Sequence, residues 1–171
     1  PNIANTSLLN FVDLQVNSIF LTSTISRFYD GSSFQNGIKT EYDYNTADQG
    51  GVQYGNLTRK TEYQWNAGWQ PYRASKTVYV PNASAHLTKL PAKTISLTCS
   101  GSCDFTNESG KASEILSLYD NATSSSTAPT VGILTAARTW VNGTDYSQVT
   151  NGYDSYGNQT SVTTYTGYGT S

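Results

Sequence analysis

The sequence predicts an all-β protein made of antiparallel hairpins, arranged as a sandwich or a barrel-like sheet. Apolar and polar residues alternate along much of the chain, which is the pattern of a strand with one buried face. Thr and Tyr, which are both enriched in strands, are abundant among the 171 residues. A short motif also recurs three times, with a Gly suited to a turn and strand-forming residues after it.

The recurring motif is ten residues long. Each copy has Gly at its second position, Thr at its fifth and an aromatic residue at its tenth. A Tyr-Asp pair precedes each copy, closer in the third than in the first two, so we interpret the extra length as insertions at a hairpin tip. Chance matching in a chain rich in Gly, Thr and Tyr is the alternative. The copies are Tyr54–Tyr63, Val131–Trp140 and Tyr156–Tyr165, and the pairs are Tyr42-Asp43, Tyr119-Asp120 and Tyr153-Asp154.

This motif resembles the Tyr-Asp (Rhs/YD) repeat family, in which Tyr-Asp is followed by a few residues, Gly-Asn, Thr and a strand. Residues 153–165 are the most similar, and the first copy also fits well. The middle copy departs, with Val131 and Ile133 where the family usually has Tyr and Asn. In that family the hairpins join into a long spiralling sheet that encloses a toxin or forms an adhesive shell at a cell surface. The resemblance implies hairpins of this kind, although 171 residues are too few to close such a shell.

Ten strands are expected, separated by loops rich in Gly, Ser, Asn and Asp. Pro71, Pro81, Pro91 and Pro129 lie at strand starts or edges, where a missing N–H does no harm. Residues Gly110–Leu118 fit a short helix as well as a strand. The expected strands are 8–21, 22–29, 38–45, 52–65, 72–80, 85–98, 112–119, 131–142, 145–153 and 159–168, and the expected loops are 30–36, 47–51, 100–110 and 121–129.

We expect one domain, residues 1–171, with residues 1–28 as an N-terminal strand segment. This segment is the most apolar part of the chain, and Val12, Leu14 and Val16 share one face of its strand. It can form an ordinary strand of its own domain. It can also pack on or insert into a neighbouring subunit, whose sheet it would complete through main-chain hydrogen bonds. Because such contacts are head-to-tail, they would produce a homo-polymer.

The two cysteines, Cys99 and Cys103, flank a Ser-Gly-Ser tripeptide and are expected to form a disulfide. A zinc site would need two further soft ligands, which the single His86 does not supply, so we predict no metal site. A disulfide indicates an oxidising compartment, and the expected location is extracellular or at the cell surface. The chain begins at Pro1 rather than Met, from which we expect that a leader or upstream region was removed.

Half of the 14 Asn residues lie in Asn-x-Ser/Thr sequons, about twice the number expected by chance, which suggests covalent glycans. A polar surface without sugar is the alternative. Asn56 and Asn158 fall in the turn of the recurring motif, where a sugar is expected to face solvent. The sequons begin at Asn5, Asn56, Asn82, Asn107, Asn121, Asn142 and Asn158.

Composition and motifs exclude several functions. A net charge of -2 does not indicate the basic surface that binds nucleic acid. No apolar run approaches the ~20 residues of a membrane span. No phosphate-binding loop or cofactor motif is present in the sequence. A catalytic triad would have to use His86, which lies in a strand-like stretch without a nucleophile elbow. We therefore predict no catalytic residues and no cofactor.

Aromatic residues indicate a competing function, because flat apolar rings can stack on sugars. Trp65, Trp69, Tyr72 and Trp140 are the candidates, and core packing is the other interpretation of them. The sequence thus predicts a non-enzymatic extracellular structural subunit that is glycosylated and self-assembles into a surface layer or filament. The alternatives are a carbohydrate-binding adhesin module and a fragment of a larger Tyr-Asp repeat toxin shell.

Overall fold

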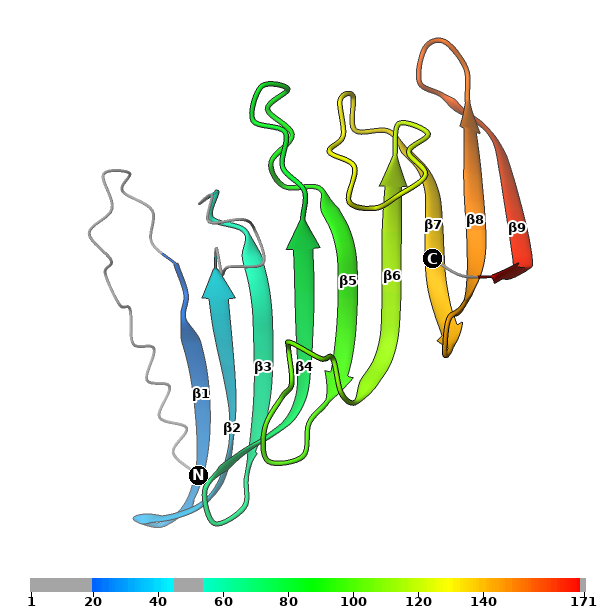
Figure 1. The fold of residues 1–171 in the computed structure, drawn as a ribbon. Helices are drawn as coiled ribbons and strands as arrows, with labels where there is room; N and C mark the ends of the chain where they lie inside the picture. The colour runs from blue at the N-terminus through cyan, green and yellow to red at the C-terminus, as the bar shows by residue number, and fades with distance from the viewer. Residues whose placement is uncertain (1–19, 45–53, 170–171) are drawn as a thin grey trace.

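The computed structural model describes residues 20–44 and 54–169, which form one antiparallel sheet and its connecting loops (Figure 1). Each strand pairs with its neighbours in sequence, so the strand order is β1 to β9 across the sheet. No helix occurs in these two ranges, and therefore none that could cross a membrane. The strands are β1 (Ser23–Asp30), β2 (Ser33–Tyr44), β3 (Leu57–Trp65), β4 (Trp69–Tyr79), β5 (Pro91–Thr98), β6 (Lys111–Tyr119), β7 (Leu134–Asn142), β8 (Asp145–Tyr153) and β9 (Gln159–Gly169).

The predicted all-β fold of antiparallel hairpins is confirmed. The sheet is open, because β1 and β9 lie at opposite edges and do not pair with each other (Figure 1). A barrel is therefore wrong, and no second sheet packs on the first within the described ranges. Closure would need matching strand tilt and shear, which a meander of neighbouring hairpins does not impose.

Nine of the predicted strands correspond to β1–β9, and residues 111–118, for which a short helix was the alternative, belong to strand β6. The prediction of strand from residue 85 is wrong, since β5 begins only at Pro91. A turn precedes it, closed by a bridge between Asn82 and Leu87. The predicted loop 30–36 is also too long. Gly31, with φ +59°, allows a two-residue turn, and β2 begins at Ser33.

The two faces of the sheet differ in chemistry. On one face, which we call the core face, two apolar clusters are buried; they consist of Ala74, Ile95 and Leu97, and of Leu116, Leu118, Ala136 and Tyr146. On the opposite face, Thr77, Thr94, Ile115, Thr139 and Ser147 form a row in register across β4–β8, and four of these five residues carry a hydroxyl group. A single layer needs a cover for its apolar side chains, and a loop supplies part of it. Residues 99–110 fold back over β3 and β4 (Figure 1).

Each even-numbered strand ends at a tyrosine, and these four residues form what we call the tyrosine ladder. Each hydroxyl donates a hydrogen bond to a carbonyl oxygen at the start of the preceding strand or, for β1, two residues before it, so the structure repeats every two strands. The bonds run from Tyr44 to Leu21 (3.3 Å), from Tyr79 to Leu57 (3.1 Å), from Tyr119 to Pro91 (3.1 Å) and from Tyr153 to Leu134 (3.0 Å).

The predicted equivalence of Gly55, Gly132 and Gly157 is confirmed by their φ angles of +70°, +90° and +83°. Only Gly adopts such angles without strain, which explains why the motif keeps it. Each lies two residues before the first residue of the next strand. In the hairpin that follows Tyr79 the same position holds Lys89, so this copy carries no glycine signal in the sequence.

The predicted Tyr-Asp pair of the first copy is wrong by two residues. Tyr44 rather than Tyr42 belongs to the ladder, because β2 continues past Tyr42 and its register shifts between Asp43 and Tyr44. Tyr119 and Tyr153 are equivalent, as the sequence predicts. The structure therefore contains four copies of the two-strand unit in the described residues, where the sequence reveals three.

Candidate functional site

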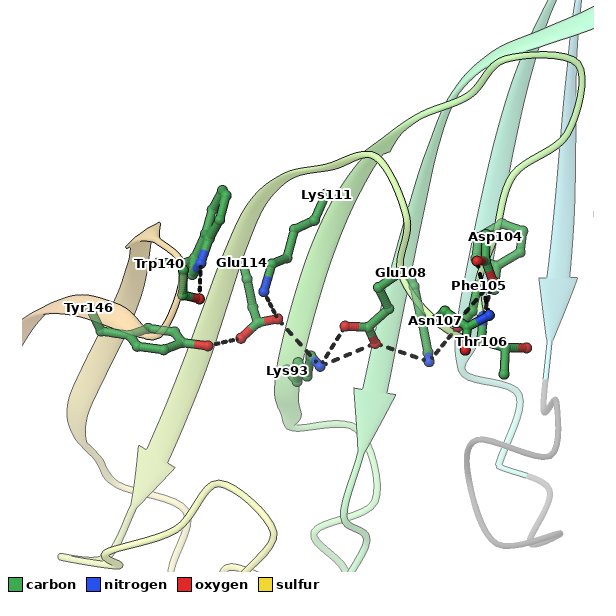
Figure 2. Close-up of polar contacts among 12 residues, drawn as sticks. Lys93, Asp104, Phe105, Thr106, Asn107, Glu108, Lys111, Glu114, Trp140 and Tyr146 are labelled. Carbon is green, nitrogen blue, oxygen red and sulfur yellow. Dashed lines mark hydrogen bonds and ion pairs between the residues drawn. The ribbon is translucent and has the colours of Figure 1, made fainter. Parts of the chain in front are cut away.

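A network of charged side chains crosses the middle of the core face (Figure 2). Its centre is Glu114 on β6, which is 2% exposed. The carboxylate lies 3.2 Å from the Lys111 Nζ and 3.3 Å from the Lys93 Nζ, and it accepts a hydrogen bond from the Tyr146 hydroxyl. Glu108 extends the network, since it pairs with Lys93 at 3.0 Å. Three strands and one loop thus meet in a single ionic cluster.

The network holds Glu114 in its charged form. Burial opposes ionisation, but the hydrogen bond from Tyr146 and the charges of Lys93 and Lys111 outweigh it, so the pKa of Glu114 lies below its usual range. Removing one partner from a buried ion pair leaves an uncompensated charge, which is strongly destabilising. The network is therefore a structural tie between β5, β6, β8 and the loop.

The network also ties the covering loop to the sheet. Lys76, a buried residue of β4, donates a hydrogen bond to the Phe105 carbonyl oxygen at 2.9 Å and lies 3.4 Å from Glu108. The Phe105 ring packs on Ala74, Ile95 and Leu97 beside the two cysteines. Its face also meets the guanidinium of Arg59 at 4.8 Å. The loop is thus a lid held by both apolar and ionic contacts.

Beside the network lies an open concavity of about 580 Å³. The hydroxyl-bearing residues 123–125 form one wall and the ionic network another. Arg138 also lines it and donates a hydrogen bond to Gln148 Oε1 at 2.9 Å. Three cations, Lys93, Lys111 and Arg138, and two carboxylates line the concavity, and both lysines are paired with those carboxylates.

A second concavity, which we call the aromatic groove, has a volume of about 360 Å³ and is open to solvent. Trp69 and Tyr63 lie in it, with the Lys39 ammonium 5.8 Å and 3.9 Å from their respective ring centroids. The Tyr63 hydroxyl donates to the carboxylate of Glu41. Burial, and then this acceptor, raise the pKa of Tyr63. The full lining is Thr61, Tyr63, Trp69, Pro71, Gly101, Ser102, Cys103 and Phe105.

The four aromatic residues proposed for sugar binding have different surroundings. Trp65 packs edge-on against Trp69 and Phe34, with centroids 5.4 Å and 4.8 Å away, as expected for core packing. Trp140 donates its indole N–H to the Gly143 carbonyl, and Lys111 lies over its ring. Tyr72 is exposed. Trp69 lines the aromatic groove.

Two aspartates of the recurring motif organise the loops at the ladder end of the sheet. The Asp120 carboxylate accepts hydrogen bonds from the main-chain N–H groups of residues 130–133, at 2.7–3.1 Å. Burial opposes its ionisation, but these bonds outweigh it and lower its pKa to about 2. Asp154 accepts similar bonds from Tyr156 and Asn158, and its pKa is also lowered. Both therefore serve to shape loops.

The predicted disulfide is present, since Cys99 and Cys103 are bonded with their Cα atoms 4.8 Å apart. It closes the first turn of the covering loop. The loop's fold also depends on Asp104, which accepts hydrogen bonds from the main-chain N–H groups of Thr106 and Asn107. Disulfide and aspartate together direct Phe105 towards the sheet.

The sequons fall into two groups. The side chains of Asn107, Asn121, Asn142 and Asn158 are exposed. Asn56 does not face solvent as expected, because it is 5% exposed and its Nδ2 donates to the Thr88 carbonyl at 2.6 Å. The Nδ2 of Asn82 likewise donates to the Pro129 carbonyl at 2.8 Å. The last sequon, Asn5, lies outside the described residues, as do Val12, Leu14 and Val16 of the predicted subunit-contact strand.

His86 lies in the turn before β5, with φ +57° and an exposed side chain. No group of three or more His, Cys, Asp or Glu residues suited to a metal ion occurs in the two described ranges. The ionic network was missed by sequence reasoning, because its members come from β4, β5, β6, β8 and a loop with no local spacing. The one local signal is the pair Lys111 and Glu114, three residues apart on β6.

Strand β9 forms an edge of the sheet with unusual composition. It is 11 residues long and contains neither a charged residue nor a proline, whereas each of the other eight strands described carries at least one charge. Its side chains from residue 159 to 167 are all exposed. Natural edge strands are usually protected from pairing by charges, prolines or short length. In composition and length, β9 lacks all three.

Comparisons of the sequence with protein families and with curated proteins, and of the structure with solved structures, gave no match.

Proposed function

We propose that this chain is a non-enzymatic, extracellular structural subunit that self-assembles through the edges of its sheet into a homo-polymer. The observation that carries the proposal is the unprotected edge strand β9 of an open sheet. Main-chain N–H and C=O groups along such an edge are a template for another strand. Four successive copies of the two-strand unit support a relation to the Tyr-Asp repeat family as part of this proposal.

The extracellular location is supported by the Cys99–Cys103 disulfide, because disulfides persist in oxidising compartments. Covalent glycans are proposed at the exposed sequons, Asn107, Asn121 and Asn158 in loops and Asn142 at the end of β7. Mass spectrometry of glycopeptides from the source material tests the site pattern. Sugar on Asn56 would contradict it, since that side chain is buried and bonded in the folded sheet.

The N-terminal segment is proposed to add a strand to a neighbouring subunit through Val12, Leu14 and Val16. Deletion of residues 1–19 tests this role and keeps Phe20 and Leu21, which contact Tyr44. Light scattering coupled to size-exclusion chromatography should show a polymer for the full chain and smaller particles for the truncated one. Equal particle sizes would remove the segment from the assembly, and a full chain that stays monomeric at high concentration would overturn the proposed function.

Carbohydrate binding is the second candidate, and the aromatic groove favours it. Trp69 and Tyr63 line it together with the hydroxyl-bearing Thr61 and Ser102, a combination of aromatic rings and polar groups typical of sugar sites. The change Trp69→Ala should abolish binding on a glycan array, while Tyr156→Ala, at an exposed tyrosine outside the groove, should not. Binding that survives Trp69→Ala removes the groove from consideration.

A further inference from the structure

Within the described residues, the tyrosine ladder ends at β9 with one position unfilled. Tyr44, Tyr119 and Tyr153 each pair in register with the first residue of the following strand, and in the last case that residue is Gln159. At the starts of β3, β5 and β7, the carbonyl of this residue also accepts a hydroxyl from the next ladder tyrosine. In the part of the chain that the structure describes, no strand follows β9 to supply a tyrosine to Gln159.

The geometry of the ladder defines the strand that would fill this position. It must run antiparallel to β9 and carry a tyrosine near the end that meets Gln159. The register of β7 and β8 defines the position of this tyrosine. Ala136 pairs with Thr150, and continuing that register places Tyr153 opposite the residue just before Leu134. From there the Tyr153 hydroxyl contacts the carbonyl oxygen of Leu134. At β9 the corresponding position lies opposite Asn158.

A second copy of β9 meets these requirements. Rotation by a two-fold axis perpendicular to the sheet makes it antiparallel to the first copy and keeps the core faces on the same side. The register that brings Tyr168 of the second copy opposite Asn158 is centred on Thr163. It pairs Thr163 with its own counterpart and Val162 with Thr164. We propose that β9 is a self-complementary edge, through which two copies join about a two-fold axis into one continuous sheet.

The side chains of β9 suit this pairing. Thr163 and Thr164 are exposed, and Val162 and Tyr165 expose 59% and 46% of their surfaces, so pairing would cover apolar area. In the proposed register, Tyr165 lies opposite the small Ser161, which leaves room for the ring. Because β9 carries no charge, its own side chains bring no like charges together across the two-fold axis.

This inference rests on the proposed function and names the partner at one edge of the sheet. A two-fold contact alone gives a closed dimer. Combined with a second contact at the other edge of the sheet, it gives an open polymer. A subunit that loses only the β9 contact therefore retains the other one and forms smaller particles rather than polymers.

Cross-linking tests the register. Thr163→Cys places two thiols next to each other on the axis, while Ser161→Cys, on the same strand and also exposed, places them about four residues apart along it. Both native cysteines are paired, so each variant has one free thiol. Mild oxidation should produce disulfide-linked dimer from Thr163→Cys at least tenfold faster than from Ser161→Cys. Equal rates, or faster cross-linking of Ser161→Cys, would overturn the proposed register.

Charge reversal tests the interface itself. Thr163→Lys and Thr163→Glu each place two like charges on the two-fold axis, so each variant alone should lose the β9 contact and form smaller particles. An equimolar mixture of the two variants pairs Lys with Glu and should restore the contact. Circular dichroism confirms that both variants fold. Unchanged particles for Thr163→Lys would overturn the inference while leaving the proposed function intact. A wild-type chain that is monomeric at high concentration would overturn both.

Discussion

The hydroxyl of Tyr119 donates a hydrogen bond to the carbonyl oxygen of Pro91 at 3.1 Å and so ties the end of β6 to the start of β5. Tyr119 is 9% exposed, and burial raises the pKa of its hydroxyl. A buried hydroxyl needs a partner, and this carbonyl is one that the hairpin register brings to the same place in every copy. The hydrogen bond of Tyr119 is therefore one of a series that recurs every two strands across the sheet.

Removal of this hydroxyl should have a measurable cost. We expect Tyr119→Phe to lower the free energy of unfolding by about 1 kcal/mol, because the Pro91 carbonyl loses its partner. Urea denaturation with an unchanged m-value measures it. The matched control is Tyr156→Phe at a residue that is 88% exposed, where the change should stay within about 0.5 kcal/mol. Equal losses in the two variants would contradict a stabilising role for the ladder.

Asp120 should make stability depend on pH below its ordinary pKa of 3.8. Its pKa in the folded protein is about 2, so the folded state binds this proton less readily than the unfolded state. The stabilisation is complete above about pH 4 and is lost as the pH falls towards 2. We expect Asp120→Asn to unfold more readily at neutral pH and to show a flatter dependence of melting temperature on pH between 4 and 2.

The control for this prediction is Asp145→Asn. Asp145 is exposed, and its carboxylate accepts no hydrogen bond from the described residues. The free energy of unfolding of this variant at neutral pH should stay within about 0.5 kcal/mol of that of the unmodified chain. An identical pH profile for Asp120→Asn and the unmodified chain would show that the loop at residues 130–133 does not depend on the charge.

Glu114 should be the most sensitive carboxylate of the sheet. Glu114→Gln preserves shape but leaves Lys111 and Lys93 without this charge, and we expect a loss of about 3 kcal/mol in the free energy of unfolding, the lower end for a buried pair because both lysines are partly exposed. Glu62→Gln is the comparison, since its partner Arg73 has a side chain that is 59% exposed, and such pairs contribute less than about 1 kcal/mol. Similar losses of free energy of unfolding in the two variants would mean that the burial of Glu114 does not increase the contribution of its ion pairs to stability.

The disulfide should contribute modestly. It closes a loop of only a few residues, for which the chain-entropy estimate is about 2 kcal/mol. Replacing both Cys99 and Cys103 with Ser should therefore lower the free energy of unfolding by about that amount, measured by urea denaturation beside the oxidised chain. A loss of more than about 4 kcal/mol would show that the covering loop detaches as a whole.

Much of the fold could be predicted from the sequence, because each strand is local and pairs with the next one along the chain. Alternation and turn residues therefore carry most of the information. The ladder was harder to predict. The copy at Tyr79 has Lys89 in place of the glycine, so the motif is not visible there. In the first copy the sequence motif points to Tyr42, whereas the register shift after Asp43 makes Tyr44 the ladder residue.

Long-range features could not be predicted in the same way. The burial of Asn56 depends on a carbonyl at Thr88, 32 residues away, and no local pattern reports it. The network around Glu114 depends likewise on Lys93, Glu108 and Tyr146 arriving from different segments. The disulfide was predictable because both cysteines lie within one turn.

An open meander does not fix its own width. A barrel admits only those strand numbers that agree with its shear and tilt, whereas among the described strands each hairpin pairs with the next and β1 does not pair with β9. The free energy of folding is then close to a sum over hairpins and their nearest-neighbour interfaces, as in solenoid proteins. Gene duplication of a two-strand unit would lengthen the sheet without remodelling the rest. The width of the sheet is thus determined by the number of two-strand units.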